Sequence, residues 1–185
     1  MSGLKTCRQC SKEFRPFQPL QAVCSGRCAT REVVAAAKAK KAAEKARDRM
    51  RKDSLMSIAD RIAVAQIEFN AYIRLRDRNT TCIDCGKPFE PQRPGGSIDA
   101  GHFRSRGAAG HLRFNEDNTF AQRKNCNRPG GATPSDFRAG VVARIGEARV
   151  LALETNNAVH KWTHEELIEI RARYAAKRKA LETNL

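Results

Sequence analysis

The chain has 185 residues, enough for one modest domain or two small ones, and carries 35 Lys and Arg against 20 Asp and Glu, a formal charge of +15. This charge attracts polyanions, so nucleic acid is the first partner to consider, ahead of an acidic membrane surface. No apolar run reaches the roughly 18 residues that a membrane span needs, and the first residues lack an apolar signal core. Seven cysteines, most in metal-type spacings, favour zinc in a reducing cytoplasm over a disulfide framework.

The first element, residues 1–30, is a cysteine array that predicts a zinc knuckle. Its members follow the pattern Cys-x2-Cys-x13-Cys-x3-Cys and are Cys7, Cys10, Cys24 and Cys28. Four thiolates at these separations can close a structural Zn²⁺ site, with Phe14, Phe17 and Val23 as its small core. The alternative is four free cysteines in a flexible arm. Zinc modules of this kind bind DNA, RNA or protein, so the array does not identify the partner.

Residues 31–79 predict a basic helical connector followed by a packing helix. The first part, residues 32–52, is rich in Ala, Lys, Arg and Glu and has no Gly or Pro, so we expect a helix without a buried face. It is either an arm that contacts phosphates or a merely soluble linker, and the residues proposed to contact DNA here are Lys40, Lys41 and Lys45.

The packing helix is predicted to begin after Ser54 as its N-cap. Apolar residues then recur on one face of a helix of about 20 residues, at Ile58, Ile62, Ala65, Phe69 and Tyr72. We expect this face to pack on the unit that follows directly, with Arg74, Arg76 and Arg78 at the far end of the helix, pointing toward solvent or DNA.

Residues 80–132 hold the chemistry. Cys82 and Cys85 open the stretch, His102 follows a short run with strand potential, and the pair Cys126-Asn127 closes it. Thiolates at both ends suggest a small metal-stabilised knuckle around a reactive centre. A neutral imidazole can take a proton from water near pH 7, and oxygen ligands such as those of Asp99 and Asn127 suit a hard divalent cation.

Residues 133–185 predict helices that pack on this core. Ser135 is the expected N-cap of a helix through Ile145, and a further helix runs to about Asn156. Thr163 and Glu166 form a capping box for the last helix. Its apolar stripe is Leu167, Ile170, Tyr174 and Leu181, with Trp162 before it as a core anchor. The fold class expected is α+β, mostly α with small zinc-knuckle and ββα-metal β elements.

The order His102, Asn118, Asn127 resembles the HNH nucleases with their ββα-metal unit. The phrases DAGHF, LRFNEDN, ARIGEARV and HKWTHEEL go further and resemble the NinG (Rap) recombination protein family of lambdoid phages, from about residue 5 to residue 182. That resemblance implies a junction-specific DNA endonuclease acting on Holliday junctions and D-loops in the host cytoplasm. Its implied partners are branched DNA and other phage recombination proteins. Two-fold junctions are often cut by dimers, but no heptad pattern demonstrates a homodimer.

By the same resemblance, His102 is the general base, Asn118 orients the loop and the base, and Asn127 is a ligand of a catalytic Mg²⁺ or Mn²⁺. The acidic ligand is open. Gly101 stands where many HNH enzymes have Asp, and Asp99 would share the face of His102 only through a bulge at residues 100–101.

A second departure concerns the core zinc site. Arg123 replaces the family's fourth cysteine, so the remaining Cys82, Cys85 and Cys126 are expected to hold zinc weakly, with a substitute ligand, or not at all. His111 is a surface histidine, a contact to phosphate, or such a substitute ligand. The residues expected to contact DNA around His102 are Arg104, Arg106, Arg113, Arg123 and Lys124. The rival interpretation is a non-catalytic zinc module that binds branched DNA and recruits other proteins.

Overall fold

The computed structural model describes residues 3–90 and 96–183. The chain divides into two compact units, Met1–Met56 and Ser57–Leu185. Both units combine short strands with helices, so the protein is a mixed α+β protein in which helices supply most of the regular structure. Within the described residues, no helix is both long and apolar enough to cross a lipid bilayer. The finer division into four domains stays a prediction.

The first unit is a two-stranded hairpin followed by one long helix. Strand β1 (Lys5–Thr6) pairs antiparallel with β2 (Glu13–Phe14), and helix α1 spans Gly26–Ser54. Phe14 lies partly buried, but Phe17 is 93% exposed, so its predicted place in the small core is wrong. Nearly every side chain of α1 is exposed, as expected for a helix that lacks an apolar stripe.

The second unit begins with helix α2 (Ile58–Arg76), whose N-cap is Ser57. Ser57 and Asp60 form a capping box, whereas Ser54 is the last residue of α1, so the predicted cap lies one turn too early. Ser57 is preferred because Asp60 stands at the N3 position and can return a hydrogen bond to the cap backbone N–H.

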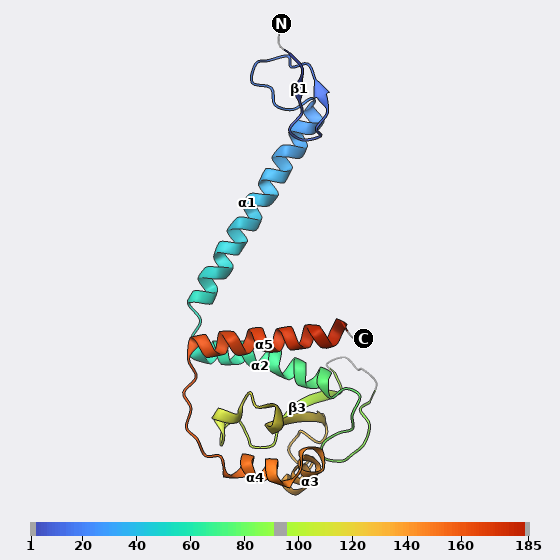
Figure 1. Ribbon diagram of the computed structural model, residues 1–185, viewed down its shortest axis with the longest axis vertical. Coiled ribbons are helices and arrows are strands. Elements are labelled where there is room, and N and C mark those ends of the chain that lie inside the picture. Colours follow the sequence, from blue (N-terminus) through green and yellow to red (C-terminus); the bar gives the residue numbers. More distant parts are fainter. Residues whose placement is uncertain (1–2, 91–95, 184–185) are drawn as a thin grey trace. The chain divides into compact units, whose positions relative to one another are not determined.

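Figure 1 shows the second unit in layers, with α2 and α5 (His164–Thr183) side by side on one side of strand β3 (Ile98–His102). Strand β4 (Thr119–Arg123) pairs antiparallel with β3. On the other side lie α3 (Pro134–Ile145) and α4 (Glu147–Thr155). Two 3₁₀ turns, η1 (Gly110–Leu112) and η2 (Glu116–Asn118), connect the strands.

Among the described residues, three apolar clusters hold these layers, and the smallest, Ala109, Leu112 and Leu153, joins the η1 segment to α4. The first joins α2, α5 and the segment before η2, and its buried members include Phe69, Ile73, Phe114, Leu167 and Tyr174. The predicted stripes of both helices are confirmed, but α2 packs on α5 as well as on β3. The second core, Ile83, Phe120, Val141 and Val150, joins β4 to α3 and α4. Helix α3 is capped by Thr133, because Asp136 completes its capping box, and the expected cap Ser135 lies within the helix.

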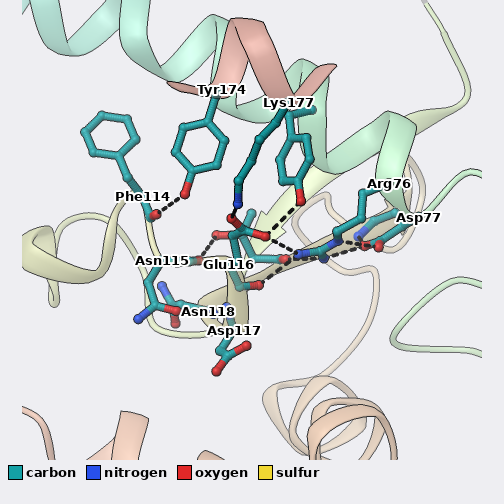
Figure 2. Close-up of polar contacts among 12 residues, drawn as sticks. Arg76, Asp77, Phe114, Asn115, Glu116, Asp117, Asn118, Tyr174 and Lys177 are labelled. Atoms are coloured by element: carbon teal, nitrogen blue, oxygen red, sulfur yellow. Dashed lines mark hydrogen bonds and ion pairs between the residues drawn. The ribbon is translucent and has the colours of Figure 1, made fainter. Parts of the chain in front are cut away.

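A polar network ties the C-terminal end of α2 to η2 and α5 (Figure 2). The Glu116 carboxylate accepts a hydrogen bond of 2.9 Å from the Tyr72 hydroxyl and pairs with the Lys177 ammonium. Arg76 donates to Asp77 at 2.7 and 2.8 Å and to the Thr119 carbonyl at 2.9 Å. These contacts fix α2 against β4, and α2 supplies one wall of the site described next.

Candidate metal centres and catalytic cavity

The N-terminal cluster brings four thiols together. The sulfur atoms of Cys7, Cys10, Cys24 and Cys28 all lie within 4.8 Å of one another. Cys24 Sγ is 3.6 Å from both Cys10 Sγ and Cys28 Sγ. Zinc–sulfur bonds of about 2.3 Å in a tetrahedron place the sulfurs roughly 3.8 Å apart, so the cluster has the dimensions of a zinc site.

Local backbone geometry builds this cluster from both sides. The turn after Cys7 closes through the Ser11 N–H, which donates to the Cys7 carbonyl at 2.8 Å. Cys28 lies in the first turn of α1, where its N–H donates to the hydroxyl of the N-cap Ser25. The turn thus provides the thiols of Cys7 and Cys10, and the start of α1 provides those of Cys24 and Cys28, as the cysteine spacing predicts.

A second cluster contains three thiols, those of Cys82, Cys85 and Cys126, again within 4.8 Å of one another. The Arg123 backbone N–H donates to Cys82 Sγ at 3.2 Å, while its guanidinium forms an ion pair with Glu90. Arg123 therefore contributes a backbone contact, and not a fourth thiol, to this cluster. Both clusters could hold a metal ion such as zinc.

His102, the last residue of β3, has a defined tautomer. Its Nε2 lies 2.9 Å from the Arg113 carbonyl oxygen, and since a carbonyl only accepts, Nε2 carries the proton and Nδ1 has a free lone pair. Burial lowers the pKa of His102 to about 4, with the charges of Arg106 and Arg113 acting in the same direction. The imidazole is therefore neutral at pH 7.

Asp99 and Asn127 meet beside His102. Asn127 Nδ2 donates to Asp99 Oδ2 at 3.3 Å, and all three side chains line one cavity of about 380 Å³. The pairing of β3 with β4 is continuous from Ile98 to His102, so the bulge considered for residues 100–101 is absent. Four consecutive β3 residues, 99–102, line this cavity, so Asp99 and His102 both reach it although they are three residues apart on a regular strand.

Gly101 lies directly against the side chain of Gln122 on β4. A Cβ atom added there would overlap the side-chain amide of Gln122, which is 3% exposed. Gln122 Nε2 in turn donates to both oxygens of Asp84, at 3.0 and 2.8 Å. An aspartate at position 101 cannot fit while Gln122 holds this place, so the acidic group beside His102 comes from elsewhere.

Asp84 is a carboxylate that the sequence did not single out. It lines a neighbouring cavity of about 260 Å³ together with His102 and Asn127, and burial raises its pKa. Its position between the first two cysteines of the core cluster gave no sequence signal, because its contact with Gln122 joins residues 38 positions apart in the chain.

Asn118 lies behind the cavity and is fully buried. Its Oδ1 accepts from the Arg104 N–H at 2.8 Å, and its Nδ2 donates to the carbonyls of Arg104 and Leu112 at 3.0 and 3.2 Å. These bonds hold the segment that leads to Arg113, the residue whose carbonyl orients His102. Asn118 does not line the cavity, so it acts on the geometry of the segment rather than in contact with a bound group.

The predicted DNA-contacting residues fall into different places. Arg106 lines the cavity and Arg113 donates to Gln66 at 3.3 Å, whereas Arg104 is bound to the C-terminal end of α4 through the Leu153 carbonyl at 2.9 Å. Lys124 lies with the Glu90-paired Arg123 beside a separate cavity. The basic residues of the arm, Lys40, Lys41 and Lys45, are exposed on α1 in the other unit.

Histidines other than His102 lie outside the cavity. His111 Nε2 is 3.1 Å from the Asn156 carbonyl oxygen, and His164 Nδ1 accepts a hydrogen bond of 2.8 Å from Arg61 Nε. The cavity is completed instead by Asn70 and Arg74 of α2. These two are four residues apart and so share one side of the helix, a polar pair beside the apolar stripe that sequence reasoning did not assign to the site.

The geometry defines a class of protein, an α+β protein with two cysteine clusters fit for metal and a histidine cavity between a helix layer and a strand pair. The family model described as Bacteriophage Lambda NinG protein matches residues 2–184, and the chain belongs to this family.

Similar curated proteins carry the same name. Protein ninG of Escherichia phage lambda is 37% identical over 191 residues, covering 95% of this chain and 91% of that protein. Protein ninG of Salmonella phage P22 is 36% identical over 197 residues, covering 97% and 95%. Protein ninG of Escherichia phage 933W is 39% identical over 123 residues, covering 66% and 59%. No solved structure matches the chain.

Proposed function

We propose that the protein is a metal-dependent DNA endonuclease of the HNH type that cuts branched recombination intermediates, such as Holliday junctions and D-loops, during phage recombination. The observation that carries the proposal is the hydrogen bond from His102 Nε2–H to the Arg113 carbonyl, because it leaves Nδ1 unprotonated and directed away from its structural partner. A general base needs such a fixed, neutral imidazole.

The residues present fit a divalent cation. Asp99 supplies a carboxylate beside His102, and Asn127, whose Nδ2 faces Asp99 in the structure, supplies its amide oxygen when the side chain rotates. Such hard ligands suit Mg²⁺ or Mn²⁺ better than thiolates do. When bound, the cation polarises the phosphoryl oxygen and stabilises the departing 3′ oxygen. The cysteine clusters take the structural role, with zinc as the ion that the four thiolates of the N-terminal cluster prefer and the three thiols of the core cluster as a weaker site.

The remaining steps belong to the chain's own side chains. His102 Nδ1 accepts the proton of a water that attacks phosphorus, and the bond to the 3′ oxygen breaks as the new phosphorus–oxygen bond forms. Arg106 lies at the same cavity and can contact the phosphate oxygens. The anionic phosphate also opposes the charges of Arg106 and Arg113, which makes the imidazole a stronger base when substrate is bound.

The alternative is a non-catalytic module that binds branched DNA and recruits recombination factors. One feature favours it, the Arg123 that stands where the resemblance to HNH nucleases expects a fourth cysteine, whereas the retained His102 and Asn127 favour the enzyme more. Both proposals use the net charge of +15 for DNA affinity.

One experiment separates them. Purified protein is incubated with a synthetic four-way junction in Mg²⁺, in Mn²⁺ and in EDTA, and product strands are measured on a denaturing gel. The endonuclease proposal expects cuts near the branch point in the presence of either cation, and none in EDTA or with His102→Ala. Tight junction binding without cleavage under all conditions would leave the recruiting module as the function.

A further inference from the structure

A second cavity adjoins the one that contains His102. It measures about 700 Å³ and lies where α2, the end of α5 and the beginning of β3 meet. Arg74 and Asp99 line both cavities, so the two are contiguous through these side chains. The other charged residues along it are Arg78, Arg178 and Glu182.

The arginines of this second cavity differ in how they are paired. Arg178 donates to Glu182 at 2.7 Å and to Glu68 at 3.4 Å, so its charge is already compensated. Arg74 and Arg78 make no side-chain hydrogen bond within residues 3–90 and 96–183. Three arginines thus face two carboxylates, Asp99 and Glu182, and the unbonded guanidinium groups lie on the α2 side.

Arg74 is the more constrained of the two. It is partly buried, and desolvation lowers its pKa, although the nearby Asp99 carboxylate acts in the opposite direction. A guanidinium held in a half-buried wall without a hydrogen-bond partner has all its donors available for an anion. Its planar fork matches the oxygens of a phosphate.

We propose that the 700 Å³ cavity is a subsite for the phosphodiester next to the one being cut, with Arg74 as its principal ligand. The inference rests on the proposed function for the position of the cut. A DNA strand that passes from the His102 cavity into this one brings successive phosphates to the two places, and the backbone of the strand, not its bases, is what the arginines recognise. Arg74 is then a substrate-binding residue that sets the register of the strand over His102.

The test couples one side chain to one phosphate. Junction DNAs are prepared in which each phosphate near the branch is replaced in turn by a neutral methylphosphonate. Their affinities are measured in EDTA for the wild type, Arg74→Gln and Arg74→Lys. Lys179→Gln, an exposed charge removed from α5, is the matched control. Each pair of one protein variant and one modified DNA forms a double-mutant cycle. In such a cycle the two changes in binding free energy are non-additive only when the side chain contacts that phosphate.

The expected result is about a tenfold loss of affinity in Arg74→Gln, with a smaller loss in Arg74→Lys. At one position, the methylphosphonate should lower the junction affinity of the wild type and of Lys179→Gln. At the same position it should cause no further loss of affinity in Arg74→Gln. Wherever cleavage is observed, that position should be the phosphate beside the cut. Coupling at the cut phosphate itself, or at no position, would overturn the subsite. Absence of cleavage by the wild type would refute the nuclease proposal alone, since the coupling is measured without metal.

Discussion

Replacing His102 with Ala is the sharpest test of the cavity. The imidazole acts on water, so its removal should lower the cleavage rate on the order of 10²–10⁴-fold while junction affinity in EDTA stays nearly constant. The loss of affinity is expected to be small because the ring is turned inward, with Nε2 at 2.9 Å from the Arg113 carbonyl oxygen.

The same variant has a pH signature whose sign follows from the structure. The pKa of His102 is lowered from 6.5 to about 4 in the folded protein, so between these values the unfolded chain binds a proton that the folded chain does not. His102 therefore contributes a loss of stability that begins as pH falls through 6.5 and is complete below pH 4. A pKa lowered from 6.5 to about 4 corresponds to about 3 kcal/mol of unfolding free energy.

The assay is denaturant unfolding followed by the fluorescence of Trp162, the only tryptophan, between pH 7.5 and 4. The difference in unfolding free energy between wild type and His102→Ala isolates the histidine, because other groups titrate in both proteins. We expect the wild type to lose about 3 kcal/mol relative to the variant over this range.

His111→Ala serves as the control, since His111 lies outside the cavity and contacts the Asn156 carbonyl. It should leave the rate within a few-fold of wild type. If His102→Ala cuts junctions as fast as the parent, His102 is not the base. A pH-independent stability difference would show that the ring is not held neutral by burial.

Three further predictions follow from the metal clusters, the arm and the strand pair. Elemental analysis should find one firmly held zinc that is lost in Cys24→Ser, whereas Cys85→Ser should change zinc content far less; unchanged zinc in Cys24→Ser would contradict the N-terminal site. If α1 is an arm, Gln at four of its lysines should weaken binding to all DNA shapes and flatten the slope of log affinity against log salt by roughly 0.9 per lost contact; an unmoved slope makes α1 a linker. These are Lys38, Lys40, Lys41 and Lys45. Gly101→Ala should cost about 1–3 kcal/mol through overlap with Gln122, whereas Gly107→Ala, with open space at its Cβ, should cost far less by the same unfolding assay; equal costs would exclude the overlap as the cause.

Several elements could be predicted because their signals are local. The Cys-x2-Cys spacing fixes a turn whatever surrounds it, and the Thr163–Glu166 capping box is confirmed by hydrogen bonds of 2.8 and 3.2 Å. The predicted N-caps of α2 and α3, Ser54 and Ser135, are wrong. The structure caps these helices with Ser57 and Thr133, because each has an Asp three residues later that completes a capping box.

The sequence by itself determined the two cysteine clusters, the apolar stripes and the solvated character of α1, since each depends on spacing along one segment. Only the tertiary structure decided which side chains meet His102. Asn127 reaches Asp99, and Arg74 joins them from α2, because the strand pairing and the packing of α2 on β3 bring together residues far apart in the chain. Gln122 excludes an acid at position 101 for the same reason, since this steric contact arises between two strands and leaves no trace in either one alone.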